Sequence, residues 1–323
     1  FRHTLKKVCR RVTKVSESAL RLERNYMKIL NFGSMNIDYV YQLPHIVEPG
    51  ETITAMGLSV NDGGKGLNQS IAMSRAGLEV YHAGRVGSDG AGLVETCRKN
   101  GVHTEYIQTV ETRTGNAIIQ VNDAGQNCIV LFPGANRANT KEHVDEVLSH
   151  FGKGDVVVLQ NEINLIDYIV DRAYEKEMVI AMNPSPFDQA VMDCDLTKIT
   201  YFFVNEIEGE MLTGEKDPQK IMAGVLAKYP MSRLILTLGS DGAWYADKDG
   251  RCYQEICKVK AVDTTAAGDT FSGYFLASVL GGKTPAQALK TATVASGIAV
   301  SRKGAVPSIP TAEEVAQKCG EME

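Results

Sequence analysis

The chain lacks several features that would place it in a specialised class of protein. Within its 323 residues, no apolar run reaches the roughly 18 residues that a membrane-spanning helix needs. Its seven cysteines are scattered and show no CxxC spacing, a pattern typical of free thiols in a reducing compartment. The net charge of −5 argues against nucleic acid as the main partner. We therefore expect a cytoplasmic protein that binds neither membranes nor nucleic acid.

Internal repeats and low-complexity tracts are also missing, and the length permits one large α/β domain with a small appendage. Residues 1–26 differ from the rest because they hold eight Lys or Arg residues and two acidic ones, without a secretory apolar core. We predict that 1–26 is a basic N-terminal extension outside the fold and that 27–323 forms the domain. An organelle-targeting peptide or an anion-binding arm are the alternatives for this segment.

Strand and helix patterns alternate along most of the chain, most regularly from about residue 141 onward. Alternation of this kind predicts a mostly parallel sheet covered by helices on both faces, which is a three-layer αβα arrangement. Two β-prone segments, 38–62 and 104–133, do not fit inside such a sheet. The second contains a hairpin signature at 122–125. We predict that the two segments form a small β-sheet lid.

The segment 263–271 carries the strongest chemical signal. Two carboxylates, Asp263 and Asp269, flank a turn of small residues that opens onto a helical pattern. A helix start without bulky side chains presents free N–H groups and the positive end of the helix dipole, which attract phosphate. A carboxylate placed there can accept the proton of a hydroxyl that attacks the phosphorus. The alternative is an Asp that caps an ordinary helix.

Four further clusters lie where strands of a parallel sheet are expected to end. An Asn and an Asp two residues apart can hydrogen-bond the hydroxyls of a sugar. A Gly-rich turn lets a ligand approach the backbone. An Asn and a Glu three residues apart can bind Mg²⁺ through water. A tight turn of small residues can lie against a nucleotide. In chain order the clusters are Asn36/Asp38, Gly63–Gln69, Asn205/Glu208 and Thr237–Gly242. Taken singly, Asn205/Glu208 is better explained as an ordinary charged helix start, and Thr237–Gly242 also fits a generic turn.

In this order, the clusters resemble the ribokinase branch of the PfkB carbohydrate kinase family, from about residue 27 to 310. The runs at 63–69 and 263–271 resemble the two signatures of the family, and 301–308 resembles the C-terminal loop of this branch. Ala266 departs mildly from the family pattern, which usually has Gly at that position. The resemblance implies a ribokinase-like fold with a β lid.

The resemblance also implies a role for each matching residue. Asp269 would be the catalytic general base, and the N–H groups of Ala266, Ala267 and Gly268 would form an anion hole. The residues that would contact the sugar are Asn36, Asp38, Gly64, Lys65, Asn68, Glu162 and Asp269. Those that would bind ATP are Asn205, Thr237, Gly239, Ser240, Gly242 and Gly268. Mg²⁺ would be held through water by Asn205 and Glu208, with Glu206 a weaker candidate. K⁺ or another monovalent cation would lie at Asp263, Thr265, Lys303 and Ser308.

The implied activity is the ATP-dependent phosphorylation of a sugar, with ribose at O5 as the first expectation. The implied partners are the sugar, ATP and a second copy of the chain joined through the lid. A kinase for another sugar or a nucleoside is the first alternative. A catalytically silent sugar-binding protein is the second, and it is disfavoured because Asp269, Gly268 and the Asn205/Glu208 pair are all present.

Overall fold

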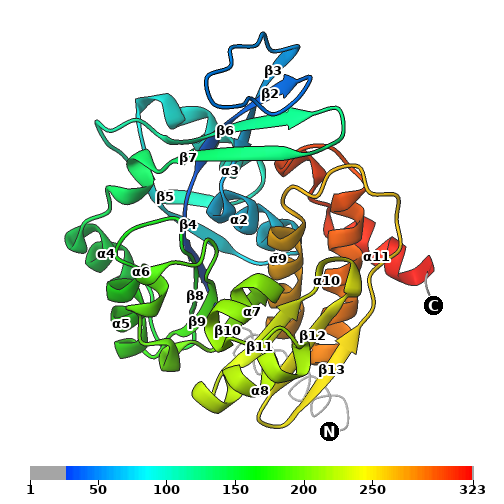
Figure 1. Cartoon of the computed structure of the whole chain (residues 1–323). Helices are drawn as coiled ribbons and strands as arrows, with labels where there is room; N and C mark the ends of the chain where they lie inside the picture. The colour runs from blue at the N-terminus through cyan, green and yellow to red at the C-terminus, as the bar shows by residue number, and fades with distance from the viewer. Residues whose placement is uncertain (1–26, 322–323) are drawn as a thin grey trace, which may run out of the picture.

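The computed structural model describes residues 27–321. The predicted extension at 1–26 and residues 322–323 lie outside the described residues. Within 27–321, nine strands form one large sheet (Figure 1). In spatial order they are β13 (Gly250–Gln254), β12 (Ala243–Asp247), β11 (Arg233–Thr237), β10 (Tyr201–Asn205), β9 (Val179–Asn183), β8 (Val156–Gln160), β1 (Ile29–Phe32), β4 (Val80–Val86) and β5 (His103–Thr109).

Helices cover both faces of this sheet, so the predicted three-layer α/β architecture is confirmed. The strands from β5 to β11 run parallel, and β12 and β13 are antiparallel additions at one edge. Every residue of β1 and β8 is buried, as expected for strands covered on two faces. One face carries α2 (Lys65–Arg75), α3 (Ala91–Lys99), α9 (Ala267–Leu280), α10 (Pro285–Val300) and α11 (Ala312–Glu321). The other carries α4 (Lys141–Leu148), α5 (Ile166–Glu175), α6 (Gln189–Met192), α7 (Glu206–Thr213) and α8 (Pro218–Lys228).

A second, smaller sheet lies at the top of Figure 1, where β1 leads into β2. Its order is β3 (Gly57–Gly63), β2 (Asn36–Leu43), β6 (Gly115–Asn122) and β7 (Asn127–Phe132). The predicted lid segment 104–133 therefore begins too early, because β5 pairs in parallel with β4 in the large sheet. An edge strand is exposed along one side, so β5 shows the same alternation of polar and apolar residues as a lid strand.

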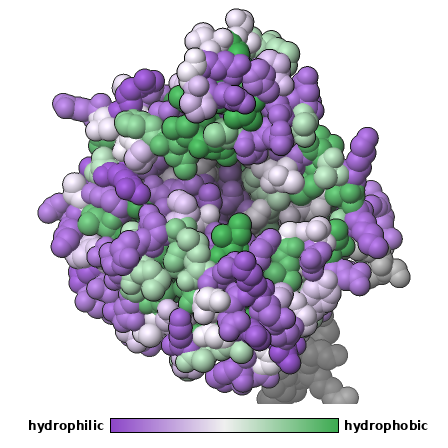
Figure 2. Space-filling view, viewed as in Figure 1, coloured by the Kyte–Doolittle hydropathy of each residue, from purple (hydrophilic) through white to green (hydrophobic). Residues whose placement is uncertain are grey.

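The small sheet exposes several large apolar side chains. Figure 2 shows hydrophobic residues gathered on it, above a hollow lined largely by hydrophilic residues. The exposed apolar residues on or beside its strands are Met56, Leu58, Val60, Ile118, Ile129, Val130, Leu131 and Phe132. We call this set the apolar lid surface. Val130 and Leu131 are neighbours on β7 and face opposite sides of the sheet, so the set covers both faces. Exposed apolar residues gathered in this way mark a candidate interaction site.

Close packing of α2 against α9 sets the position of the expected catalytic residues. A Cβ added to Gly273 of α9 would lie 2.6 Å from the Cβ of Ala72 in α2, so only glycine permits this approach. The two helices pack side by side in the core on one face of the large sheet. Their N-terminal turns, which carry residues 65–69 and 267–269, therefore lie next to each other.

Two details differ from the sequence-based expectations. Helix α9 begins at Ala267, so Asp269 lies inside its first turn and does not precede the helix. The four-residue helix α6 was not expected, and it begins where the Asp188 side chain accepts a hydrogen bond from the Ala190 N–H. Over residues 27–321, no helix combines the length and the apolar character needed to cross a membrane.

Candidate functional site

The start of α9 presents N–H groups that no side chain caps. Ala266, at the N-cap position, adopts a left-handed conformation with φ 58° and ψ 11°, and it makes no side-chain cap bond. The Ala267 N–H already donates to the Thr264 carbonyl at 3.2 Å. A Cβ on Gly268 would meet no atom within 4 Å, so the space beside this turn is open. Of the three N–H groups expected to bind an anion, those of Ala266 and Gly268 are therefore better placed than that of Ala267.

Asp269 is held by two amide side chains of α2. Asn68 Nδ2 donates to Asp269 Oδ2 at 3.0 Å, and Gln69 Nε2 donates to Asp269 Oδ1 at 2.9 Å. Burial raises the pKa of Asp269, while the charge of Lys65 and the two amide donors oppose that effect. The carboxyl group is thus oriented, nearly buried and not paired directly with a cation. A carboxylate in this setting is suited to accept a proton.

Lys65 and Glu162 form an ion pair beside Asp269. The two side chains approach to 3.1 Å, and the Glu162 side chain is 9% exposed. Glu162 also accepts hydrogen bonds from the Lys65 backbone N–H and from the Ser34 hydroxyl. Burial lowers the pKa of Lys65, but the charges of Glu162 and Asp269 outweigh it, so the ammonium group is charged. These contacts fix the glycine-rich turn against the end of β8 and bring the predicted Glu162 to the site.

Asn36 and Asp38 reach the site from β2 of the small sheet. Asn36 is buried, and its Oδ1 accepts a hydrogen bond from Asn136 Nδ2 at 2.7 Å. A Cβ on Gly63 would lie 2.0 Å from Asp38 Oδ2, so the carboxylate lies directly over the glycine backbone. Burial, followed by the charges of Glu162 and Asp62, raises the pKa of Asp38 to about 7.

Gly64 completes the turn between β3 and α2. Its φ is 95°, a conformation that L-residues rarely adopt, and a Cβ there would lie 3.0 Å from the Asn36 backbone N. The glycine therefore allows the turn to lie against the start of β2. The predicted sugar-contacting residues Gly64, Lys65 and Asn68 are thus brought together with Asn36 and Asp38.

Asn205 and Glu208 form a reciprocal capping box at the start of α7. The Glu208 N–H donates to Asn205 Oδ1 at 2.9 Å, and the Asn205 N–H donates to Glu208 Oε2 at 3.0 Å. Burial raises the pKa of Glu208. Among residues 27–321, no group of three or more His, Cys, Asp or Glu gathers to hold a metal ion. The two hard oxygen donors, with lone pairs left over, fit an Mg²⁺ that keeps its waters.

The turn after β11 lies next to the start of α7. A Cβ on Gly239, which has φ 53°, would be 4.0 Å from Glu206 Oε1. Gly242 has φ 86°, and a Cβ added there would lie 2.3 Å from the Gln254 carbonyl oxygen, so the turn depends on glycine at this position. Thr237 Oγ1 donates to the Val204 carbonyl at 3.4 Å and Ser240 Oγ to Asp241 Oδ1 at 3.4 Å. The predicted nucleotide residues Thr237, Gly239, Ser240 and Gly242 therefore lie at the carboxyl end of β11.

Asp263 ties the turn before α9 to the C-terminal loop. Its Oδ1 accepts hydrogen bonds from the Thr265 N–H and hydroxyl, and its Oδ2 accepts one from the Gly304 N–H at 2.9 Å. Burial raises the pKa of Asp263, but these hydrogen bonds and the charge of Lys303 lower it overall. Ser308 is buried and its hydroxyl donates to the Ala305 carbonyl. Both Asp263 oxygens are thus engaged by N–H or O–H donors, and they join the turn before α9 to the loop that holds Lys303 and Ser308.

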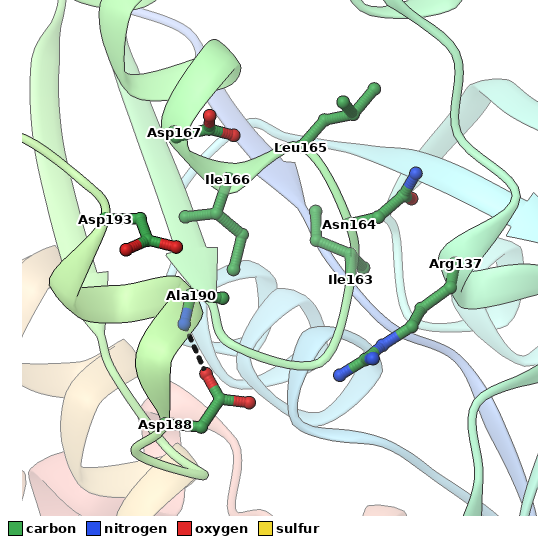
Figure 3. Close-up of a pocket in the computed structure, with 9 residues that line it drawn as sticks. All are labelled: Arg137, Ile163, Asn164, Leu165, Ile166, Asp167, Asp188, Ala190 and Asp193. Atoms are coloured by element: carbon green, nitrogen blue, oxygen red, sulfur yellow. Dashed lines mark hydrogen bonds between the residues drawn. The ribbon is translucent and has the colours of Figure 1, made fainter.

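A cavity of about 260 Å³ lies between the starts of α5 and α6 (Figure 3). Arg137 points toward it from the segment after β7, opposite Asp188. Asp167 and Asp193 also line it, so carboxylates outnumber cations at its wall. It contains no residue that the sequence assigned to sugar, ATP or cation binding.

Sequence reasoning missed three residues that shape the site. Gln69 adjoins Asn68 in the motif and could have been found by its position. Gln160 lies in the same short run as Glu162, at the end of β8, and its amide donates to Gln69 Oε1 at 2.7 Å. Asn136 has no motif around it, and only the folded chain brings it to Asn36.

The comparisons with known proteins agree with this geometry. The pfkB family carbohydrate kinase profile matches residues 27–312. A ribokinase of Haemophilus influenzae is 35% identical over 292 residues, which cover 87% of this chain and 95% of that protein. The crystal structure of a ribokinase from Cryptococcus neoformans with ADP has a TM-score of 0.79 at 34% identity and covers 90% of this chain and 99% of that one. An Arabidopsis thaliana ribokinase complexed with ribose and ATP has a TM-score of 0.81 at 26% identity and covers 91% of this chain and 98% of that one.

Proposed function

Because the chain belongs to the pfkB family of carbohydrate kinases, we propose that it phosphorylates D-ribose at O5 with ATP as the phosphoryl donor. The observation that carries this proposal is Asp269, a nearly buried carboxylate in the first turn of α9, beside N–H groups that no side chain caps. A base and an anion-binding helix start are two of the groups on which transfer of a phosphoryl group to a hydroxyl depends.

In the proposed mechanism, Asp269 accepts the proton of the attacking hydroxyl. Asn68 and Gln69 hold its two oxygens, so the carboxylate is oriented before the sugar arrives. The γ-phosphate lies at the start of α9, where the Ala266 and Gly268 N–H groups stabilise the charge that develops on its oxygens. Transfer of the phosphoryl group to the sugar oxygen and of the proton to Asp269 leaves ADP and a sugar phosphate.

The sugar is held between the small sheet and the first turn of α2. Asn36 and Asp38 bind its hydroxyls from one side, while Lys65 and Asn68 bind from the other, with Glu162 behind Lys65. The raised pKa of Asp38 favours an acid that donates as well as accepts hydrogen bonds near neutral pH. Two amides and two carboxyl groups around one space fit a ligand with several hydroxyl groups.

ATP would lie along the edge formed by Thr237, Gly239, Ser240 and Gly242, with its phosphates toward α9. Asn205 and Glu208 would hold Mg²⁺ through water, and this ion supplies charge neutralisation for the phosphates when bound. Asp263 and the backbone of Thr265, with carbonyls of the loop that holds Lys303 and Ser308, would hold K⁺ or a similar cation. From there, the cation would stiffen the turn before α9 without contact to the substrate.

The apolar lid surface supports a homodimer formed through the small sheet. Strand β7 is exposed along its whole length, and it is an edge strand of that sheet. A second copy covering this surface would bury apolar side chains and an unpaired strand edge together.

The buried unbridged thiols of Cys97, Cys194 and Cys257 are consistent with a reducing cytoplasm as the location.

A steady-state assay over a panel of pentoses, hexoses and nucleosides, with ATP, Mg²⁺ and K⁺, tests the proposal. Ribose is expected among the best substrates by kcat/KM, and ³¹P and ¹H NMR of the product should place the phosphate on O5. Better turnover of a nucleoside or a hexose would reject ribose and keep the kinase assignment. No ADP release with any acceptor would support the silent sugar-binding alternative instead.

A further inference from the structure

A row of buried amides leads from Asp269 into the protein, past the residues assigned above. Gln69 donates to Asp269, and Gln69 Oε1 accepts from Gln160 Nε2 at 2.7 Å. Gln160 Nε2 also donates to Asn31 Oδ1 at 3.0 Å. Asn31 and Gln160 are fully buried and Gln69 is 1% exposed, so water cannot replace a lost partner. The row joins α2, β8 and β1 to the start of α9.

The direction of these hydrogen bonds is set at one end by the backbone. An amide side chain can present its N–H₂ or its carbonyl to a given neighbour, depending on which way it is turned. Asn31 Nδ2 donates to the Gly66 carbonyl at 2.6 Å, and a carbonyl can only accept. Asn31 Oδ1 must then face Gln160, whose two N–H groups serve Asn31 and Gln69. Gln69 is left with its carbonyl toward Gln160 and its N–H₂ toward Asp269.

We propose that Asn31 and Gln160 are positioning residues, which fix the amide of Gln69 so that it always presents an N–H group to Asp269. The inference rests on the proposed kinase function, in which Asp269 accepts the proton of the sugar. A reversed Gln69 would place a carbonyl oxygen against the carboxylate, and two acceptors at hydrogen-bonding distance repel each other. The correct orientation keeps Asp269 ionised and aimed at the hydroxyl.

The other groups that face Asp269 are Lys65 and Asn68 of α2 and Glu162, which follows β8. Burial raises the pKa of Asp269, Lys65 and the two amides lower it, and Glu162 raises it. Loss of the Gln69 N–H removes one of the opposing effects, so the pKa of Asp269 rises further. In such a variant, turnover should begin to fall at a higher pH as the solution is acidified.

The test compares Gln160→Met and Gln69→Met with the wild-type chain, by kcat against pH at saturating sugar and ATP. Both variants are expected to lose roughly 10- to 100-fold in kcat because the base is misplaced. In both variants, the fall of kcat on the acidic side of the pH profile (the acidic limb) should also shift to higher pH by about one unit. The double variant should lose no more than Gln69→Met alone, because Gln160 acts through Gln69.

Ser70→Ala is the matched control. Ser70 is as buried as Gln160, and its hydroxyl accepts from Asn31 Nδ2 at 2.7 Å. Its removal leaves the bond from Asn31 to the Gly66 carbonyl, so the orientation of the row is unchanged. The control is therefore expected to keep the wild-type kcat and acidic limb, even if its melting temperature falls.

The outcomes separate this inference from the proposed function. A wild-type chain without kinase activity rejects the function. An active wild type whose acidic limb is unmoved in both Met variants overturns the positioning role, and so does an equal loss of kcat in Ser70→Ala. If Gln160→Met does not fold, Gln160→Asn takes its place, because its shorter amide cannot reach Gln69 and the same upward shift is expected.

Discussion

Replacement of Asp38 by Asn is expected to stabilise the unliganded protein, and the gain should grow with pH. Burial and the charges of Glu162 and Asp62 raise the pKa of Asp38 from 3.8 to about 7. The folded protein therefore keeps a proton that the unfolded chain releases above about pH 4. Folding stability of the wild type falls as pH rises from about 4 to 7 and then levels off. Asn resembles the protonated acid and removes this loss.

The size of the effect follows from the shift in the pKa of Asp38. About three pKa units correspond to a ceiling of about 4 kcal/mol, and solvent screening of a partly exposed carboxylate reduces this to about 1–2 kcal/mol. Sugar binding should change in the opposite direction. In Asp38→Asn, the loss of a hydrogen bond to an ionisable group should raise the Kd for ribose by about 10- to 100-fold.

Urea unfolding of both proteins between pH 5 and 8, with ribose titrations by calorimetry, measures these effects. The free energy of unfolding of Asp38→Asn should exceed that of the wild type by an amount that increases up to pH 7. Asp89→Asn is the control with the opposite sign, because hydrogen bonds from Thr114 lower the pKa of Asp89. That variant should lose stability at neutral pH and recover as pH falls. A difference for Asp38→Asn that is independent of pH, or a loss at pH 8, would refute the reasoning.

Three further substitutions test the framework of the site by urea unfolding. Ala266→Gly should stabilise the protein by about 0.5–1 kcal/mol, since relief of left-handed strain exceeds the entropy cost of glycine; a loss would contradict this. Gly66→Ala should cost about 3 kcal/mol, because its Cβ would lie 2.3 Å from the Ser34 backbone N. Glu162→Ala should cost about 3–5 kcal/mol, as it leaves the Lys65 ammonium without its partner; a change below 1 kcal/mol would show that water solvates Lys65 instead.

The sequence predicted the large sheet well because strand and helix alternate along most of the chain and the central strands are mostly apolar. The boundary of the lid was harder to predict from the sequence. Strand β5 (His103–Thr109) alternates as a lid strand does, and only its pairing with β4 shows that it belongs to the large sheet. Alternation reports that one side of a strand is exposed, not which sheet contains it.

The candidate site was predictable where its residues stand in short motifs, and not where the fold alone assembles them. Asn68 and Asp269 are 201 residues apart, yet each lies in a motif, so their meeting could be expected. Asn136 and Asn31 stand in no motif, and their roles depend on side chains that approach across elements. Asn205 and Glu208 had two interpretations, a charged helix start and an Mg²⁺ site. The capping box confirms the helix start, and the Mg²⁺ site stays a prediction.

The most direct test of the proposed chemistry is kcat of Asp269→Asn with ribose and ATP. The variant keeps the size of the side chain and removes the group that accepts the proton. We expect kcat to fall by about 10²–10⁴-fold, while the Kd values for ribose and ATP stay within a few-fold of wild type. Turnover near the wild-type rate in a correctly folded Asp269→Asn would contradict the assignment of Asp269 as the base.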